Sequence, residues 1–170
     1  MTAEAHTFLS LMKLAASETR EGFQGAAPGH VLVIGDDATQ ESGATSFKTA
    51  VGRGGGGLMP GDPTILPVKK REGGNAFTSM ITVGRAPNND VVLHDPSVSK
   101  FHAYFTQREG GLHVIDAGAT NFTKLNGAQL APNKPSAALG SGDLLDFGDV
   151  RARFLDARGL FDYLRAGLLE

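Results

Sequence analysis

The sequence contains no cysteine, little net charge and no long hydrophobic run. The absence of cysteine from its 170 residues excludes disulfide bonds, thiolate metal sites and a cysteine nucleophile. The formal net charge is -2, so neither nucleic acid nor an anionic membrane is an expected partner. No apolar run approaches the roughly 18 residues that a membrane-spanning helix needs. Recognition of an anion would therefore depend on a few donors at defined positions.

The N-terminus lacks the pattern of a secretory signal. Glu4 stands where a signal peptide carries positive charge, and Lys13 interrupts the apolar stretch. We therefore expect a cytoplasmic protein. The cysteine-free composition, rich in glycine and alanine, favours a bacterial source.

Apolar spacing divides the chain into three parts. One amphipathic helix is predicted over residues 5–22, and the apolar run at residues 30–34 predicts a buried strand. Residues 36–63 include four successive glycines and are interpreted as a linker. We expect an N-terminal extension at residues 1–63, a β-sandwich at 64–156 and a C-terminal helix at 157–170.

The middle part has short strand candidates separated by turn-forming clusters. The expected strands are residues 64–70, 80–84, 91–93, 103–107, 112–115, 124–125, 144–147 and 150–155. Residues 72–75 are interpreted as a hairpin turn between the first two, and Pro67 indicates that the first is an edge strand. Strands recurring about every 8–12 residues are typical of an all-β, antiparallel β-sandwich.

Three loop segments carry an unusual set of polar residues. Gly84-Arg85 ends a predicted strand, Ser97 to His102 precedes the next, and Asp116 to Gly127 forms a longer segment. In this order and at this spacing, the segments resemble the forkhead-associated (FHA) domain, over about residues 64–156. The resemblance implies an eleven-stranded β-sandwich whose loops bind a phosphothreonine peptide. It further implies an adaptor rather than an enzyme, and no cofactor. The implied partner is a protein that a Ser/Thr kinase has phosphorylated on threonine.

The resemblance also assigns roles to individual residues. Arg85 and Ser99 would contact the phosphate, Lys100 matches a position that often does so, Thr120 would line the pocket, and Asn121 would bind the peptide backbone. These types suit the chemistry, because guanidinium, ammonium and hydroxyl groups together can satisfy three phosphate oxygens.

Four further residues match positions that hold the loops in shape, namely Gly84, His102, Asn126 and Gly127. Three residues depart from the family pattern: Phe122 replaces a glycine, Ala119 a serine and Lys100 the commoner arginine. Since a phenylalanine does not freely adopt positive φ, we expect the loop after Asn121 to bend differently.

The same residue types are also compatible with catalytic or metal-binding roles. Ser99, His102 and Asp116 are the residue types of a catalytic triad, and Asp143, Asp146 and Asp149 are carboxylates that could bind a metal. We interpret the first set as a loop brace and the second as a solvated face with turns, so no catalytic or metal residue is predicted. The other four histidines, His6, His30, His94 and His113, lack the paired spacing of a zinc site.

Two alternatives for the function stay open. An exposed Phe122 would favour a phospho-independent scaffold or an oligomerisation domain. Phosphorylation of Thr39, Thr45 or Thr49 could instead dock the N-terminal segment into the pocket. The sequence does not determine the oligomeric state, the kinase or the residues preferred beside the phosphothreonine.

Overall fold

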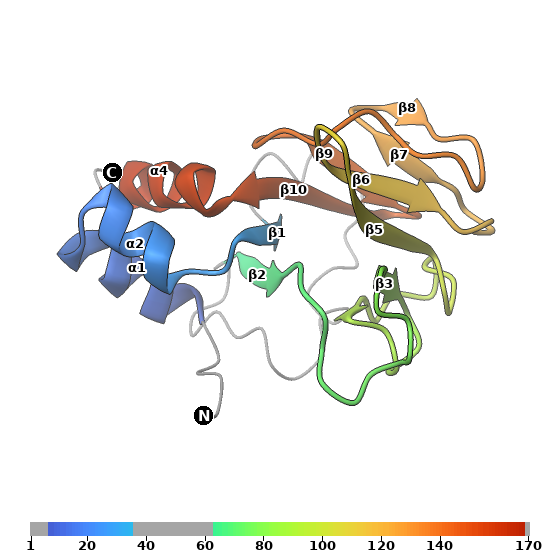
Figure 1. Ribbon diagram of the computed structural model, residues 1–170, viewed down its shortest axis with the longest axis horizontal. Helices are drawn as coiled ribbons and strands as arrows, with labels where there is room; N and C mark the ends of the chain where they lie inside the picture. Colours follow the sequence, from blue (N-terminus) through green and yellow to red (C-terminus); the bar gives the residue numbers. More distant parts are fainter. Residues whose placement is uncertain (1–6, 36–62, 169–170) are drawn as a thin grey trace.

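The chain folds as a β-sandwich with three helices at one end (Figure 1). The computed structural model describes residues 7–35 and 63–168. Ten strands in these residues form two sheets, and all but one strand pair are antiparallel. The all-β architecture with flanking helices is therefore confirmed. The predicted linker and the three threonines at 39, 45 and 49 lie outside the described residues.

The larger sheet has six strands in the order β2-β1-β10-β9-β7-β8. The strands are β1 (His30–Ile34), β2 (Thr64–Pro67), β7 (Thr123–Leu125), β8 (Ala128–Gln129), β9 (Leu144–Phe147) and β10 (Val150–Asp156). The strand β2 lies at an edge and ends at Pro67, as its sequence predicted, because proline cannot donate to a further strand.

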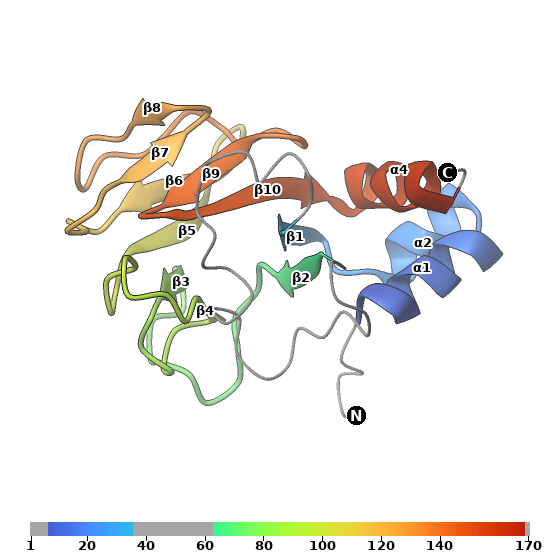
Figure 2. The ribbon, with the colours of Figure 1, turned by 180° about the vertical axis from the view of Figure 1, so that it is seen from behind.

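The smaller sheet has four strands in the order β4-β3-β5-β6. The strands are β3 (Ile81–Gly84), β4 (Val91–Val92), β5 (Ala103–Arg108) and β6 (Gly111–Asp116). Figure 2 shows β3 and β4 beside each other. Between the sheets lies the main core, in which Phe105, Phe147 and Phe154 are almost fully buried and the Phe105 ring contacts the other two.

The strand β1 is buried on both faces, which explains its unbroken apolar sequence. Leu32 and Ile34 face the sandwich core, whereas Val31 and Val33 face a second core beneath the helices. The strand pairs with both β2 and β10. It precedes the predicted sandwich boundary at residue 64 and nevertheless belongs to the larger sheet. The division of the chain into domains stays a prediction.

Three helices cover the second core. They are α1 (Phe8–Ser17), α2 (Arg20–Ala26) and α4 (Ala157–Leu168), and α4 follows β10 without a gap. The single helix predicted over residues 5–22 is thus two helices. Glu18 and Thr19 are extended, and the Thr19 hydroxyl accepts a hydrogen bond from the Gly22 N–H, which starts a new helix. No helix in the described ranges has the length and apolar composition to cross a membrane.

The predicted hairpin at residues 72–75 is wrong, because β2 and β3 belong to different sheets. The connection is fixed by side chains instead of by ladder pairing. The Lys70 ammonium donates to Asp90, to Asn75 and to the Met80 carbonyl at 2.6, 2.9 and 3.0 Å. A partly exposed lysine and a buried aspartate thereby fix the connection from one sheet to the other.

The carboxylate of Asp90 is the centre of this network. Its side chain is fully buried, and it accepts hydrogen bonds from the backbone N–H groups of Arg71 and Thr82, both at 2.8 Å. Burial alone raises the pKa of Asp90, but these bonds and the Lys70 charge outweigh it and lower the pKa below 3.8. Asp90 therefore stays ionised and keeps all of these donors satisfied near neutral pH.

Replacing Asp90 by Ala is expected to lower the free energy of unfolding by about 3 kcal/mol, because Lys70 and two backbone donors lose their buried acceptor. Urea unfolding measures the change. Asp162→Ala is the matched control, since Asp162 pairs with Arg20 where both side chains are about half exposed (53% and 44%). The Asp162 variant should lower the free energy of unfolding by less than about 1 kcal/mol. Equal losses in the two variants would contradict the central role of Asp90.

Candidate functional site

Two loops of the smaller sheet lie side by side at the end of β3. The Arg85 N–H donates to the Ser99 carbonyl at 2.9 Å, and the Ala86 N–H donates to the Lys100 carbonyl at 3.2 Å. Gly84 makes this approach possible, because a Cβ there would collide with the Lys100 carbonyl and lie 2.8 Å from the Asn89 amide nitrogen. The Gly-Arg pair thus positions Arg85 against the Ser99 loop.

Asn89 is a supporting residue that sequence reasoning missed. Its amide nitrogen donates to the carbonyls of Ala86 and Lys100 at 2.9 and 2.7 Å, and the residue is only 4% exposed. A cluster of asparagines such as the one after Arg85 is typical of a turn. Which of them folds inward depends on the facing loop, which is distant in the sequence.

Arg85 is anchored and still exposed. Its Nε donates to the Val98 carbonyl at 3.0 Å, which fixes the direction of the guanidinium. A guanidinium carries five N–H donors, and this bond uses one. The terminal nitrogens therefore keep donors for an anion at the surface.

A third loop joins the first two through Ser99 and Asn121. The Ser99 hydroxyl oxygen accepts a hydrogen bond from the Thr120 N–H at 3.1 Å, and the Asn121 amide donates to the Ser97 carbonyl at 2.9 Å. Lys100, Thr120 and Asn121 are exposed. The three loops that the sequence singled out are therefore adjacent in space.

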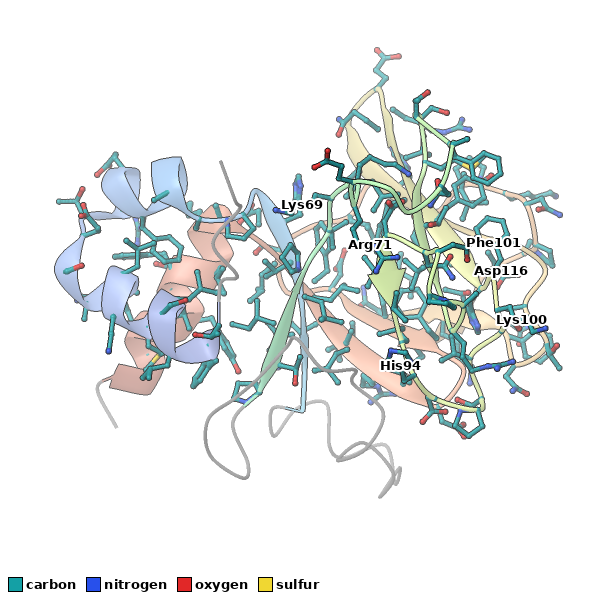
Figure 3. The ribbon with its side chains drawn as sticks, turned by 90° about the horizontal axis from the view of Figure 1, so that it is seen from below. Lys69, Arg71, His94, Lys100, Phe101 and Asp116 are labelled. Carbon is teal, nitrogen blue, oxygen red and sulfur yellow. The ribbon has the colours of Figure 1, made fainter. Side chains whose placement is uncertain are left out.

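These loops lie at the end of the sandwich opposite the helices. The turn between β9 and β10 contacts them, since the Asp149 N–H donates to the Ser97 hydroxyl at 2.9 Å. From that turn, β10 runs to α4 at the other end. Lys100 and Phe101 accordingly lie on the side of the molecule away from the helices (Figure 3).

His102 is fully buried and bridges two of the loops. Its Nδ1 accepts a hydrogen bond from the Ser99 N–H at 3.1 Å, so in the neutral ring Nε2 carries the proton and donates to the Phe122 carbonyl at 2.8 Å. Burial lowers the pKa of His102 below 6.5, although the Phe122 carbonyl and the Asp116 charge partly oppose this. The expected brace is thus a neutral imidazole.

The hydrogen bonds of Ser99, His102 and Asp116 differ from those of a catalytic triad. In a triad the imidazole accepts a proton from the serine hydroxyl. Here His102 accepts from the Ser99 backbone, while the Ser99 hydroxyl oxygen contacts Thr120. Asp116 hydrogen-bonds instead to the N–H groups of Gly118 and Ala119, and it accepts the Thr123 hydroxyl at 2.6 Å.

The backbone of Phe122 has positive φ, although its residue type predicted that the loop would avoid this conformation. Its φ is 64°, in the left-handed region, and its side chain is 46% exposed. The carbonyl accepts hydrogen bonds from His102 and from the Gly148 N–H, at 2.8 and 3.1 Å. These tertiary contacts hold the backbone in a conformation that the residue type disfavours.

Asn126 and Gly127 lie at the far end of β7 from Asn121. Both have positive φ, 50° and 88°, and they form the turn between β7 and β8. Asn126 contacts the start of β9, where its side-chain oxygen accepts from the Leu144 N–H at 2.9 Å. They shape that hairpin at the far end of the third segment, and within the described ranges the hydrogen bonds of Asn126 go to Asp143 and Leu144, not to the residues around Ser99.

Comparison with known proteins agrees with this arrangement. A family model described as the FHA domain matches residues 81–148, which include all three loops. The chain is 34% identical over 120 residues to the oxoglutarate dehydrogenase inhibitor of Corynebacterium efficiens, covering 67% of this chain and 78% of that protein. It is 30% identical over 122 residues to the glycogen accumulation regulator GarA of Mycobacterium tuberculosis, covering 70% of each.

Solved structures of related folds were also found. The MEK1 FHA domain matches with a TM-score of 0.47 and 23% identity, covering 76% of this chain and 90% of that one. A domain studied for phosphothreonine-dependent FHA interactions matches with a TM-score of 0.45 and 18% identity, covering 74% and 95%.

Gly84→Ala is expected to lower the free energy of unfolding by about 1–3 kcal/mol, because the added methyl group forces the Lys100 carbonyl away. Thermal or urea unfolding measures the loss. Gly29→Ala is the control, since a Cβ at Gly29 meets no atom within 4 Å. A Gly84 variant as stable as the control would show that the two loops are not closely packed.

Acidification is expected to destabilise the fold through His102. Its folded-state pKa lies below 6.5, so the unfolded chain binds the proton first, and the free energy of unfolding falls as the pH drops below about 6.5. Urea unfolding at several pH values measures this slope. A His102→Asn variant should lack this part of it. Parallel curves for the two proteins would contradict the assignment.

Proposed function

Because this chain belongs to the FHA domain family, we propose that it is a cytoplasmic adaptor that binds phosphothreonine on partner proteins. The observation that carries the proposal is the meeting of three loops, in which the Ser99 hydroxyl contacts the Thr120 backbone and Arg85 contacts the Ser99 loop. These contacts gather donors from three separate parts of the chain at one surface.

The charges of the site suit a phosphate ester. A phosphothreonine carries about -1.5 to -2 charges and three acceptor oxygens. We assign phosphate contact to Arg85, Ser99 and Lys100, and contact with the rest of the peptide to Thr120 and Asn121. Gly84, Asn89 and His102 would hold these residues in place. Two exposed cations are sufficient at such a site, so the net charge of -2 is compatible with anion binding.

The proposed partner is a protein phosphorylated by a Ser/Thr kinase, and the proposed role is regulatory and not catalytic. Two relatives are named as a regulator of glycogen accumulation and an inhibitor of oxoglutarate dehydrogenase, which supports action on another protein. The contacts of His102 support the same conclusion, because its Nδ1 accepts from a backbone N–H. A short peptide offers a small interface, so we expect micromolar affinity, about -8 kcal/mol.

A second candidate is a phospho-independent scaffold. Phe101 and Phe122 are 42% and 46% exposed, and each directly follows a proposed binding residue. Exposed aromatic residues often mark protein contacts. Equal affinity for the phosphorylated and unphosphorylated forms of one partner would favour this candidate over the adaptor.

Arg85→Ala is expected to weaken binding of a phosphothreonine peptide by about 2–5 kcal/mol, because the phosphate loses its bidentate donor. Calorimetric titration of the peptide measures the loss. Arg108→Ala is the matched control, since Arg108 is an exposed arginine at the opposite end of β5. Unchanged affinity in the Arg85 variant would refute the site assignment.

A further inference from the structure

Phe122 combines two features that are each unfavourable in a folded protein. Its φ of 64° lies in the left-handed region, which is unfavourable for a residue with a Cβ. Its ring is 46% exposed, so the apolar surface gains little from folding. Glycine or asparagine at this position would reduce the backbone cost and expose no ring. A contribution of this side chain to folding therefore does not explain its presence.

The backbone of Phe122 is held firmly while its ring is not. The carbonyl accepts hydrogen bonds from the buried imidazole of His102 and from the Gly148 N–H, and the N–H donates to the Ala119 carbonyl at 3.4 Å. In the described part of the chain, the aromatic contacts do not include the Phe122 ring. The loop thus presents an exposed aromatic side chain from a fixed position.

The other exposed phenylalanines differ from Phe122 in this respect. Phe101 stacks on Tyr104 with ring centroids 6.0 Å apart, so its ring already has a partner. Phe77 is 52% exposed, but it lies in the connection before β3, outside the three loops. Phe122, in contrast, directly follows Asn121, whose amide is hydrogen-bonded to the Ser97 loop.

We propose that Phe122 is a specificity-determining residue, whose ring packs against an apolar side chain of the partner close to the phosphothreonine. The inference rests on the proposed phosphothreonine function and adds the chemistry of the flanking residue. Because hydrogen bonds already fix the backbone that carries the ring, only the side-chain torsions lose freedom on binding, so burial of the ring favours the complex. An apolar side chain fits better than a basic one, because the exposed cations Arg85 and Lys100 on the adjoining loops would repel a basic residue.

The test compares wild type with Phe122→Gly on phosphothreonine peptides in which each flanking position is varied in turn between Leu, Ala, Lys and Asp. Wild type should favour Leu over Ala at one position by about fivefold to tenfold, as expected for one apolar contact. In Phe122→Gly this preference should disappear, while affinity for the all-Ala peptide stays within about twofold. Phe122→Tyr should retain the preference, and the control Phe77→Ala should leave it unchanged.

Thermal unfolding gives an independent readout. Because glycine adopts positive φ without strain, Phe122→Gly should melt at the wild-type temperature or about 2–4 °C above it. A lower melting temperature would mean that the ring supports the fold, which overturns the proposal. The same Leu preference in wild type and Phe122→Gly, or equal loss of affinity for every peptide, would also overturn it.

Arg85→Ala separates this inference from the proposed function. If Arg85→Ala abolishes binding while Phe122→Gly leaves the Leu preference intact, the adaptor function stands and the role of Phe122 fails. If Arg85→Ala binds as wild type does, the phosphothreonine function itself fails. If unphosphorylated Leu peptides bind wild type as tightly as phosphorylated ones, and Phe122→Gly loses both, Phe122 belongs to a phospho-independent contact.

Discussion

The buried imidazole of His102 connects two of the three loops that form the candidate site. One ring nitrogen accepts from the Ser99 backbone, and the other donates to the Phe122 carbonyl. Both bonds require a neutral ring with its proton on Nε2, and burial favours that form by lowering the pKa. The positions of Ser99, Thr120 and Asn121 are therefore coupled through one fully buried side chain.

A few polar side chains hold this end of the molecule together in the same way. Asn89 fixes the Lys100 carbonyl, Asp116 fixes the backbone at Gly118 and Ala119, and Asp90 fixes the connection between the sheets. Each satisfies backbone donors or acceptors that the short strands leave unpaired. The irregular loops consequently have defined shapes, and the exposed groups of Arg85 and Lys100 are presented from a rigid base.

The opposite end of the sandwich is held together by apolar packing. There β1 and β10 contribute apolar side chains to both faces of the larger sheet, so the main core and the helical core share the same strands. Leu11, Phe23 and Leu160 from the three helices are fully buried in the helical core. Since β10 runs from the turn beside the loops to the start of α4, the helices and the candidate site lie at opposite ends of one strand.

Much of the fold follows from local pattern. Alternation and turn residues located nearly all of the described strands, and the apolar run of β1 predicted its burial, because side-chain period and burial are properties of a short segment. The residue types of the loops, read with the family resemblance, also selected the residues that the structure brings together around Ser99. Those predictions depend on order and composition alone.

Tertiary structure decided the rest. Which sheet β3 joins, which asparagine folds inward, and how Phe122 adopts positive φ all depend on partners far away in the chain: Lys70 with Asp90, Asn89 with Lys100, and Phe122 with His102 and Gly148. Local propensity opposes the Phe122 conformation, and two hydrogen bonds to its carbonyl overcome it. The sequence by itself determined the secondary-structure elements and the chemical groups of the site. Long-range hydrogen bonds determined how those groups meet, because such bonds form only once the two sheets have packed.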